Sequence, residues 1–146
     1  YNGTAWTELA TFNTVRHSGT WAADGTQAAA IMAGGEPPAL SDTETWDGSS
    51  WSEVSELNTA RDNCTSTSEG TSTASLVFMG GSPAPNTNKT EEWNGASWTE
   101  IANLNTSMGG GTAAAGGSAT AGVAAYLGAT EEWNVPGETT VSFTVS

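Results

Sequence analysis

The sequence predicts an all-β fold built from about three four-stranded modules of the β-propeller type. Two observations predict it: a tryptophan-rich phrase recurs at a regular interval, and turn residues divide each interval into short strands. The phrase reads TETWDGSSWSE at residues 43–53 and TEEWNGASWTE at residues 90–100. Four antiparallel strands in every repeat of about 45 residues are typical of propeller blades.

The repeat covers nearly the whole chain. The second tryptophan of the phrase falls at Trp6, Trp51 and Trp98, at spacings of 45 and 47 residues. Turn residues then divide the middle unit into strands at residues 63–68, 72–79, 89–93 and 97–104. The predicted organisation is three blade repeats, at residues 1–46, 47–93 and 94–134, followed by a β-strand tail at residues 135–146.

Glycine-containing pairs are expected to form the tight hairpin turns between these strands. Asn, Asp and Gly tolerate positive φ, so Asp-Gly and Asn-Gly pairs favour two-residue turns. The predicted turns are Asp24-Gly25, Glu69-Gly70, Asn94-Gly95 and Gly116-Gly117.

The ring of blades does not close within this sequence. Closed propellers have about four to eight blades, and three are too few. The chain opens with a fourth-strand segment at residues 4–10 that has no third strand ahead of it. It ends with a third strand at residues 129–133 and a tail that places Val141, Phe143 and Val145 on one face. The tail could supply the fourth strand of the last module, and another chain or missing sequence would complete the ring.

Composition excludes several classes of partner. The 146 residues carry 3 Lys or Arg and 16 Asp or Glu, which gives a net charge of −13. Nucleic-acid binding needs cationic side chains in number, so we expect none, and no apolar run is long enough to insert into a membrane.

The sequence offers little catalytic chemistry. Cys64 is the only cysteine and His17 the only histidine, too few for a structural zinc site, so no metal or cofactor is expected. The doublets Glu91-Glu92 and Glu131-Glu132 sit on predicted strands, where adjacent side chains point to opposite faces. No catalytic residues are predicted, and an enzyme is not expected.

The repeated residues are expected to be structural. Large aromatic side chains at repeated positions fill the space between adjacent blades. Arg16 and Arg61 are expected to pair with Glu44, Glu91 or neighbouring carboxylates, since a planar donor suits a link between blades. The set comprises these two arginines with Trp6, Trp46, Trp51, Trp93, Trp98, Trp133, Gly34, Gly35, Gly80 and Gly81.

Taken together, these motifs resemble the kelch repeat. A glycine pair closes the second strand, an acidic third strand ends in Trp, and the fourth strand carries a second Trp. The combined phrase is similar to the kelch-like arrays of tailed-phage virion proteins, especially those of marine phages. The third unit departs from the pattern, with Met108 in place of Arg and Ala129 in place of the second Gly. It is therefore expected to be a degenerate capping module.

Four residues outside the repeat are candidates for ligand binding. Trp21 has Ser66 and Ala113 as its counterparts, and an extra aromatic side chain suits a sugar or protein ligand, although it also could compensate for small neighbours. The loops at residues 36–42 and 82–89 differ between units, and such loops often carry specificity. They supply the other candidates, Glu36, Asn86 and Asn88.

The resemblance implies a non-enzymatic virion protein, exposed on a phage tail, fibre or capsid, with a structural and adhesive role. Its partners would be further copies of itself or other virion proteins, and a host-surface glycan or receptor. The expected location is the virion or the extracellular space. Two alternatives stay open: a bacterial extracellular adhesin or filament subunit that assembles by strand exchange, and a glycan-binding lectin-like module.

Overall fold

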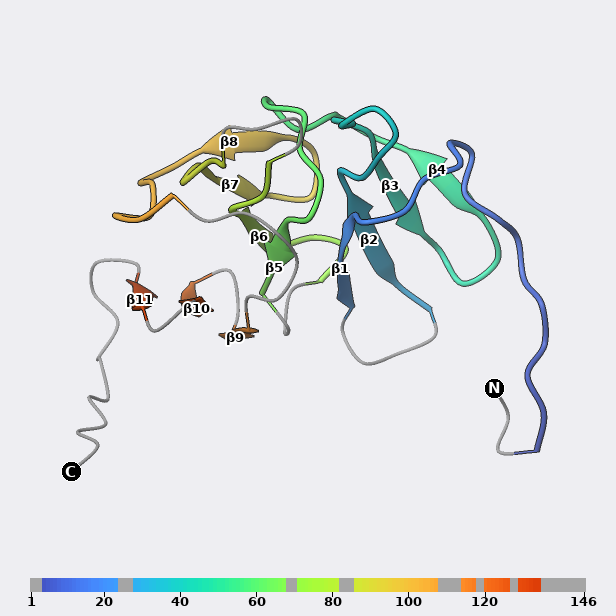
Figure 1. Cartoon of the computed structure of the whole chain (residues 1–146). Helices are drawn as coiled ribbons and strands as arrows, with labels where there is room; N and C mark the ends of the chain where they lie inside the picture. The colour runs from blue at the N-terminus through green and yellow to red at the C-terminus, as the bar shows by residue number, and fades with distance from the viewer. Residues whose placement is uncertain are drawn as a thin grey trace.

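A computed structural model describes residues 4–23, 28–67, 71–81, 86–107, 114–117, 120–126 and 129–134, which form three antiparallel sheets (Figure 1). Sheet 1 contains β1 (Thr20–Ala23), β2 (Ala30–Ala33), β3 (Thr43–Trp46) and β4 (Trp51–Glu53). Sheet 2 contains β5 (Thr65–Ser66), β6 (Ser75–Phe78), β7 (Thr90–Trp93) and β8 (Trp98–Glu100). Sheet 3 contains β9 (Ala114–Gly117), β10 (Ala121–Tyr126) and β11 (Ala129–Asn134).

Each sheet is a simple meander, in which strands that follow one another in sequence are neighbours in space. The registers of sheets 1 and 2 match, because Trp46 pairs with Trp51 in one and Trp93 with Trp98 in the other. The first strands lie side by side: β1 contacts β5, and β5 contacts β9. The Thr20 hydroxyl donates to Ser66 Oγ at 2.9 Å, and Ser66 in turn donates to the Trp21 carbonyl oxygen.

This arrangement confirms the predicted all-β, propeller-like fold class. Four-stranded meanders with neighbouring first strands are the arrangement of propeller blades. The described residues contain no helix that is long and apolar enough to cross a membrane.

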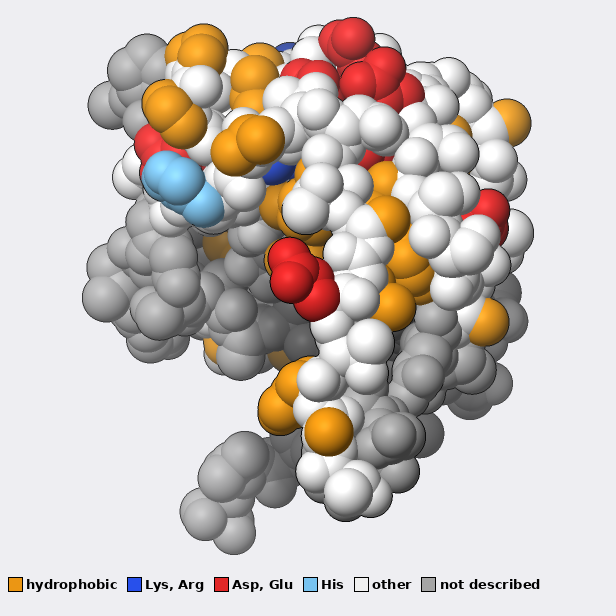
Figure 2. All heavy atoms as spheres, turned by 90° about the vertical axis from the view of Figure 1, so that its right-hand side faces the viewer, with side chains coloured by type: hydrophobic (Ala, Val, Ile, Leu, Met, Phe, Trp, Pro, Cys, Tyr) orange, Lys and Arg blue, Asp and Glu red, His pale blue; other side chains and the backbone are white. Residues whose placement is uncertain are grey.

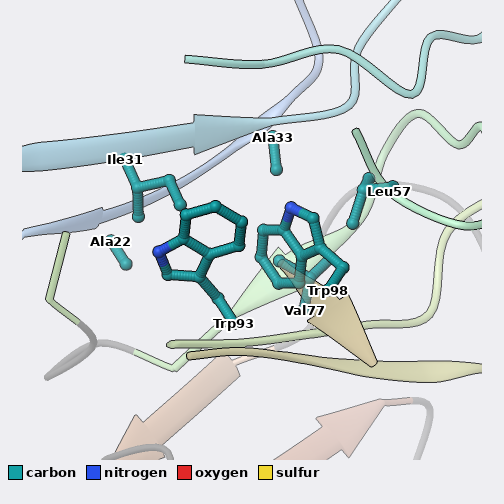
Figure 3. Close-up of a cluster of buried hydrophobic side chains, with 7 residues drawn as sticks. All are labelled: Ala22, Ile31, Ala33, Leu57, Val77, Trp93 and Trp98. Atoms are coloured by element: carbon teal, nitrogen blue, oxygen red, sulfur yellow. The ribbon is translucent and has the colours of Figure 1, made fainter. Parts of the chain in front are cut away.

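Sheets 1 and 2 are held together by two indole rings and a set of smaller side chains. Trp93 is 1% exposed and Trp98 is 6% exposed. Figure 3 shows both rings from sheet 2 against Ala22, Ile31 and Ala33 of sheet 1. Small side chains on the facing strands leave the volume that the large rings occupy.

Sheets 2 and 3 meet in the same way, with one difference. Leu76 and Phe78 of β6 face Ala124 of β10, and Trp133 packs against them as the counterpart of Trp93. No counterpart of Trp98 lies at this second interface in the described part of the chain. Among the described residues, the second interface therefore contains one indole ring where the first contains two.

A carboxylate on the third strand of each sheet holds the linker that precedes the sheet. In sheet 2, Glu91 Oε2 accepts hydrogen bonds from the backbone N and side-chain Nδ2 of Asn58, at 2.7 and 2.8 Å. Asn13 binds Glu44 and Asn105 binds Glu131 through the same pair of groups. We call these three linker–glutamate contacts the asparagine clamps.

The two repeated arginines reach the same glutamates. Arg61 Nη2 lies 2.5 Å from Glu91 Oε1, both side chains are fully buried, and Arg61 Nη1 also donates to the Lys89 carbonyl oxygen at 3.0 Å. Arg16 Nη2 lies 3.1 Å from Glu44 Oε1 in a buried pair. That second pair lacks hydrogen-bond geometry, and the Arg16 guanidinium has no hydrogen-bond partner among the described residues.

The glycine pairs allow the linker to pass close to the end of the second strand. Gly34 has a φ of 69°, and a Cβ there would lie 2.5 Å from the Arg61 carbonyl oxygen. Gly80 has a φ of 97°, and its Cβ would lie 2.5 Å from the Asp62 carbonyl oxygen. The adjoining Gly35 and Gly81 donate their backbone N–H groups to those same two carbonyl oxygens. Only glycine fits both the conformation and the close approach.

Two sequence expectations differ from the structure. The segment at residues 4–10 pairs with no described strand, and Trp6 is 85% exposed instead of packed between blades. A strand needs the edge of another strand to pair with, and no strand in the described part of the chain pairs with this segment. Gly116-Gly117 lies within β9, where Gly117 pairs with Gly122, so it is not the predicted turn. The predicted turns at 24–25 and 69–70, and the tail at 135–146, lie outside the described residues.

Candidate assembly site

A pocket of about 170 Å³ lies between sheets 2 and 3. Its lining includes Phe78, Thr90, Leu104, Ala124, Glu131 and Trp133. Apolar cavities of about 150 Å³ admit a benzene molecule, so this pocket is large enough for an aromatic ring. We call it the interblade pocket.

The position of the interblade pocket corresponds to that of Trp98 at the first interface. Trp98 there donates its indole Nε1 to Thr43 Oγ1 at 3.0 Å and packs beside Leu57. The registers make Thr90 the counterpart of Thr43, and Leu104 the counterpart of Leu57. Both counterparts line the pocket, so the pocket is the space that a fourth-strand tryptophan of sheet 3 would fill.

The N-terminal segment carries the third tryptophan of this kind. Trp6 is followed by the Asn13 clamp after seven positions, the same spacing that separates Trp51 from Asn58 and Trp98 from Asn105. Trp6 and Leu9 are 85% and 63% exposed. Figure 1 shows the segment running past β4 and away from the sheets. The segment thus has the sequence of a fourth strand and lies outside any described sheet.

Four aromatic rings gather on the side of sheet 1 that faces away from sheet 2. Ring centroids are 4.5 Å apart for Phe12 and Trp51, 5.4 Å for Phe12 and Trp21, and 5.3 Å for Trp46 and Trp51. Figure 2 shows this side of the molecule, where hydrophobic side chains reach the surface between polar groups and carboxylates. We call these four residues the aromatic face.

The aromatic face is the counterpart of a buried interface. Trp46 and Trp51 occupy the positions of Trp93 and Trp98, which sheet 1 covers. On sheet 1 Phe12 and Trp21 pack beside these rings: Trp46 is 8% exposed and Trp51 is half-buried, whereas Trp21 stays 53% exposed. Sequence reasoning singled out Trp21 but missed Phe12. The signal was present, because Phe12 replaces the leucine that precedes the other two clamp asparagines, at Leu57 and Leu104.

The other three binding candidates do not join Trp21. Glu36 lies at the end of sheet 1 from which the β2–β3 loop leaves, and its Oε1 is 3.7 Å from Nδ1 of the exposed His17. Asn86 is exposed in the corresponding loop of sheet 2. Asn88 has a structural contact, because its Nδ2 donates to the Leu104 carbonyl oxygen at 2.8 Å and so anchors a linker. The four candidates therefore lie at two separate places on the molecule.

The described residues contain no group of three or more His, Cys, Asp or Glu side chains that could hold a metal ion. Cys64 as a residue is only half-buried, but desolvation of its thiol raises the pKa to about 11. A thiol with this pKa stays protonated at neutral pH and is a poor nucleophile.

Cys64 is therefore expected to react slowly with a disulfide reagent such as DTNB in the folded protein at pH 8. The rate should rise as the pH approaches 11, and unfolding in guanidinium chloride should bring it to that of an ordinary thiol. Stopped-flow absorbance measures both. A folded-state rate equal to that of a free thiol at pH 8 would contradict the assigned environment.

Glu131 is expected to titrate below its ordinary pKa of 4.5, because the backbone N–H of Asn105 donates to its carboxylate and favours the charged form. A lowered folded-state pKa contributes stability that is present above the unfolded-state pKa and is lost as the pH falls through the folded value. Asn105→Ala, which removes only the side-chain hydrogen bond, should raise this pKa part of the way. Carbon-detected NMR of the Glu131 carboxyl tests it, and an unchanged midpoint would exclude the side-chain contact in solution.

Comparisons with known proteins agree with the fold and go no further. The fold is similar to that of a solved structure described as the structure of YjhT, with a TM-score of 0.59 and 18% sequence identity. The matched region covers 80% of this chain and 35% of the YjhT chain, so this chain spans about a third of that structure. No family model and no curated protein matches the sequence.

Proposed function

We propose that this chain is a non-enzymatic structural module that assembles with further propeller blades, as an exposed part of a virion. The observation that carries the proposal is that the row of described sheets is open at both ends. One end presents Trp6, 85% exposed on a fourth-strand segment, and the interblade pocket lies beneath the sheet at the other end. Closed propellers have about four to eight blades, and an open row leaves interblade surfaces to be covered.

The low content of reactive groups supports the non-enzymatic part of the proposal. His17 is exposed beside Glu36, and Cys64 has a raised pKa. The buried glutamates of sheets 1 and 2 are engaged by the asparagine clamps and by Arg16 or Arg61. Carboxylates held in this way stabilise linkers and are not available as general acids or bases.

The virion location rests on the resemblance of the repeated phrase to kelch-like arrays of tailed-phage proteins. A strongly acidic, soluble surface suits an exposed particle protein in a saline medium, where salt screens the repulsion between copies. Multiple copies on one particle would raise a weak contact to a useful avidity.

Hydroxyl-radical footprinting of the native assembly tests the structural role. In the isolated chain, Trp6 and Trp21 are expected to oxidise rapidly, because both are largely exposed. In the native assembly both should be protected, whichever polypeptide covers them. The loop that contains Glu36, in which Pro37 and Pro38 are exposed, provides an internal reference for the rate of oxidation. Equal oxidation of Trp6 in the isolated chain and in the native assembly would contradict the assembly role.

Adhesion is a second role, and the loops at one end of the sheets favour it. The His17–Glu36 pair and the exposed Asn86 lie in connections that leave neighbouring sheets at corresponding positions. A glycan array probed with the labelled chain tests whether these loops bind carbohydrate. Binding that is lost in Glu36→Ala or Asn86→Ala would support adhesion, and binding lost only in Trp21→Ala would move it to the aromatic face.

A further inference from the structure

The geometry points to a second copy of this chain as the partner: residues 4–10 of one copy pair with β11 of the other, and Trp6 fills the interblade pocket. This inference rests on the assembly role proposed above and names its partner and its anchor residue. Its evidence is the first interface of the same chain, which shows what a completed junction contains.

The linker spacing supports the exchange. In the intact junction, the fourth-strand Trp51 is followed after seven positions by Asn58, which clamps Glu91 of the next sheet. Trp6 stands seven positions before Asn13, which clamps Glu44 of its own sheet 1. The equal spacing places Trp6 in the fourth strand of the blade that precedes sheet 1. The blade that lacks such a strand among the described residues is sheet 3.

The interblade pocket has the groups that a tryptophan at this position uses. Thr90 supplies a hydroxyl at the position where Thr43 accepts the hydrogen bond of Trp98. Leu104 and Trp133 supply apolar walls, in place of Leu57 and Trp93. The indole of a second copy would thus bury its ring and satisfy its N–H group, the two requirements for a buried tryptophan.

The same placement covers the aromatic face. When residues 4–10 of one copy pair with sheet 3 of the partner, sheet 1 of that copy packs on the partner's sheet 3. This packing is the same as that of sheet 2 on sheet 1 within one copy. Val123 and Ala125 of β10 stand at the register positions of Ile31 and Ala33, which pack on Trp93 and Trp98. Val123 is 40% exposed, and the residues opposite it and Ala125 in β9 are Gly116 and Ala114. Val123 and Ala125 would pack on the aromatic face as Ile31 and Ala33 pack on Trp93 and Trp98 at the first interface.

Two copies joined at both ends would place six sheets in one ring, within the range of about four to eight blades. Such a ring has two identical head-to-tail junctions, and closure prevents growth into a filament. Each copy carries a net charge of −13, so the junction must form against repulsion and by apolar burial. Association should therefore strengthen between about 0.01 M and about 1 M salt, as the Debye length falls from about 30 Å to about 3 Å.

Native mass spectrometry and sedimentation of the whole 146-residue chain test the inference by complementation. Trp6→Ser removes the donor and keeps the pocket, whereas Leu104→Glu places a carboxylate in the pocket and keeps the donor. We expect the unaltered chain to be a dimer and each variant alone to be a monomer. A mixture of the two variants should contain a dimer with one copy of each, because one intact junction remains.

Two further variants guard against misfolding. Ala102→Glu, at an exposed residue of the pocket lining, replaces Leu104→Glu if that variant lacks the circular dichroism of the folded chain. Thr90→Val keeps the shape and removes only the hydroxyl, and it should weaken each of the two junctions about tenfold.

Three results would overturn the inference: a monomeric unaltered chain in high salt, a Trp6→Ser variant as dimeric as the unaltered chain, or a mixture that fails to pair. If the chain is monomeric but its Trp6 is protected in the native assembly, the structural role still holds, and the partner is another polypeptide instead of a second copy. Unprotected Trp6 in that assembly would remove the structural role itself.

Discussion

Glu91→Gln is expected to lower the free energy of unfolding by about 3–5 kcal/mol, the range for breaking one partner of a buried ion pair. Glutamine keeps the size of the side chain but removes its charge, which leaves the fully buried Arg61 guanidinium uncompensated. The glutamine amide N–H groups would also face the Asn58 N–H groups, which now donate hydrogen bonds to the carboxylate. Chemical denaturation followed by tryptophan fluorescence measures the loss.

Glu131→Gln is the matched control for this prediction. Glu131 has the same asparagine clamp through Asn105, but it is less buried, and the sequence has Met108 where the other linkers have arginine. A smaller loss of stability is therefore expected for Glu131→Gln than for Glu91→Gln. The double variant Arg61→Met with Glu91→Gln should lose less than the sum of its single changes, because it leaves no unpaired charge. Equal losses for the two glutamates would show that the buried arginine pair adds nothing.

Trp98→Ala is expected to cost about 3–5 kcal/mol, the range for truncating a large buried aromatic side chain. Its indole is 6% exposed, packs in the core between sheets 1 and 2, and donates to Thr43. Removing it would leave a cavity at the interface that positions the two blades. Denaturation at low protein concentration measures the effect on the monomer.

The repeat provides controls at the same sequence position. Trp51→Ala should cost less than Trp98→Ala, because Trp51 is half-buried on the aromatic face. Trp6→Ala should leave the monomer nearly unchanged, because Trp6 is 85% exposed. If Trp6→Ala were as costly as Trp98→Ala in the monomer, the Trp6 ring would be packed within the isolated chain, which would contradict its placement in the pocket of a neighbouring copy.

Much of the fold could be predicted from the sequence because the repeat carries it. The turn pairs and the alternation of side chains locate β5 to β8 close to their observed places, and the Gly34 and Gly80 positions follow from the repeated glycine pair. Gly116-Gly117 misled the prediction, because two glycines also tolerate an extended strand when small residues such as Gly122 lie opposite.

The site was predicted in part. The missing edge for residues 4–10 was visible from strand order, but the pocket that corresponds to it requires three-dimensional register, since Thr90 and Leu104 lie 14 positions apart in sequence. The asparagine clamps were also missed. Asn13, Asn58 and Asn105 stand in the aligned phrase, yet their bonds to Glu44, Glu91 and Glu131 span 26 to 33 positions, beyond the reach of local pattern rules.

The most direct test is a structure of the native assembly, solved well enough to place side chains at the interblade pocket between sheets 2 and 3. We expect an indole there that belongs to Trp6 of a neighbouring copy, with its Nε1 within hydrogen-bonding distance of Thr90 Oγ1 and residues 4–10 paired along β11. A pocket filled by residues of the same copy's tail, or open to solvent, would rule out the exchange of Trp6 between copies.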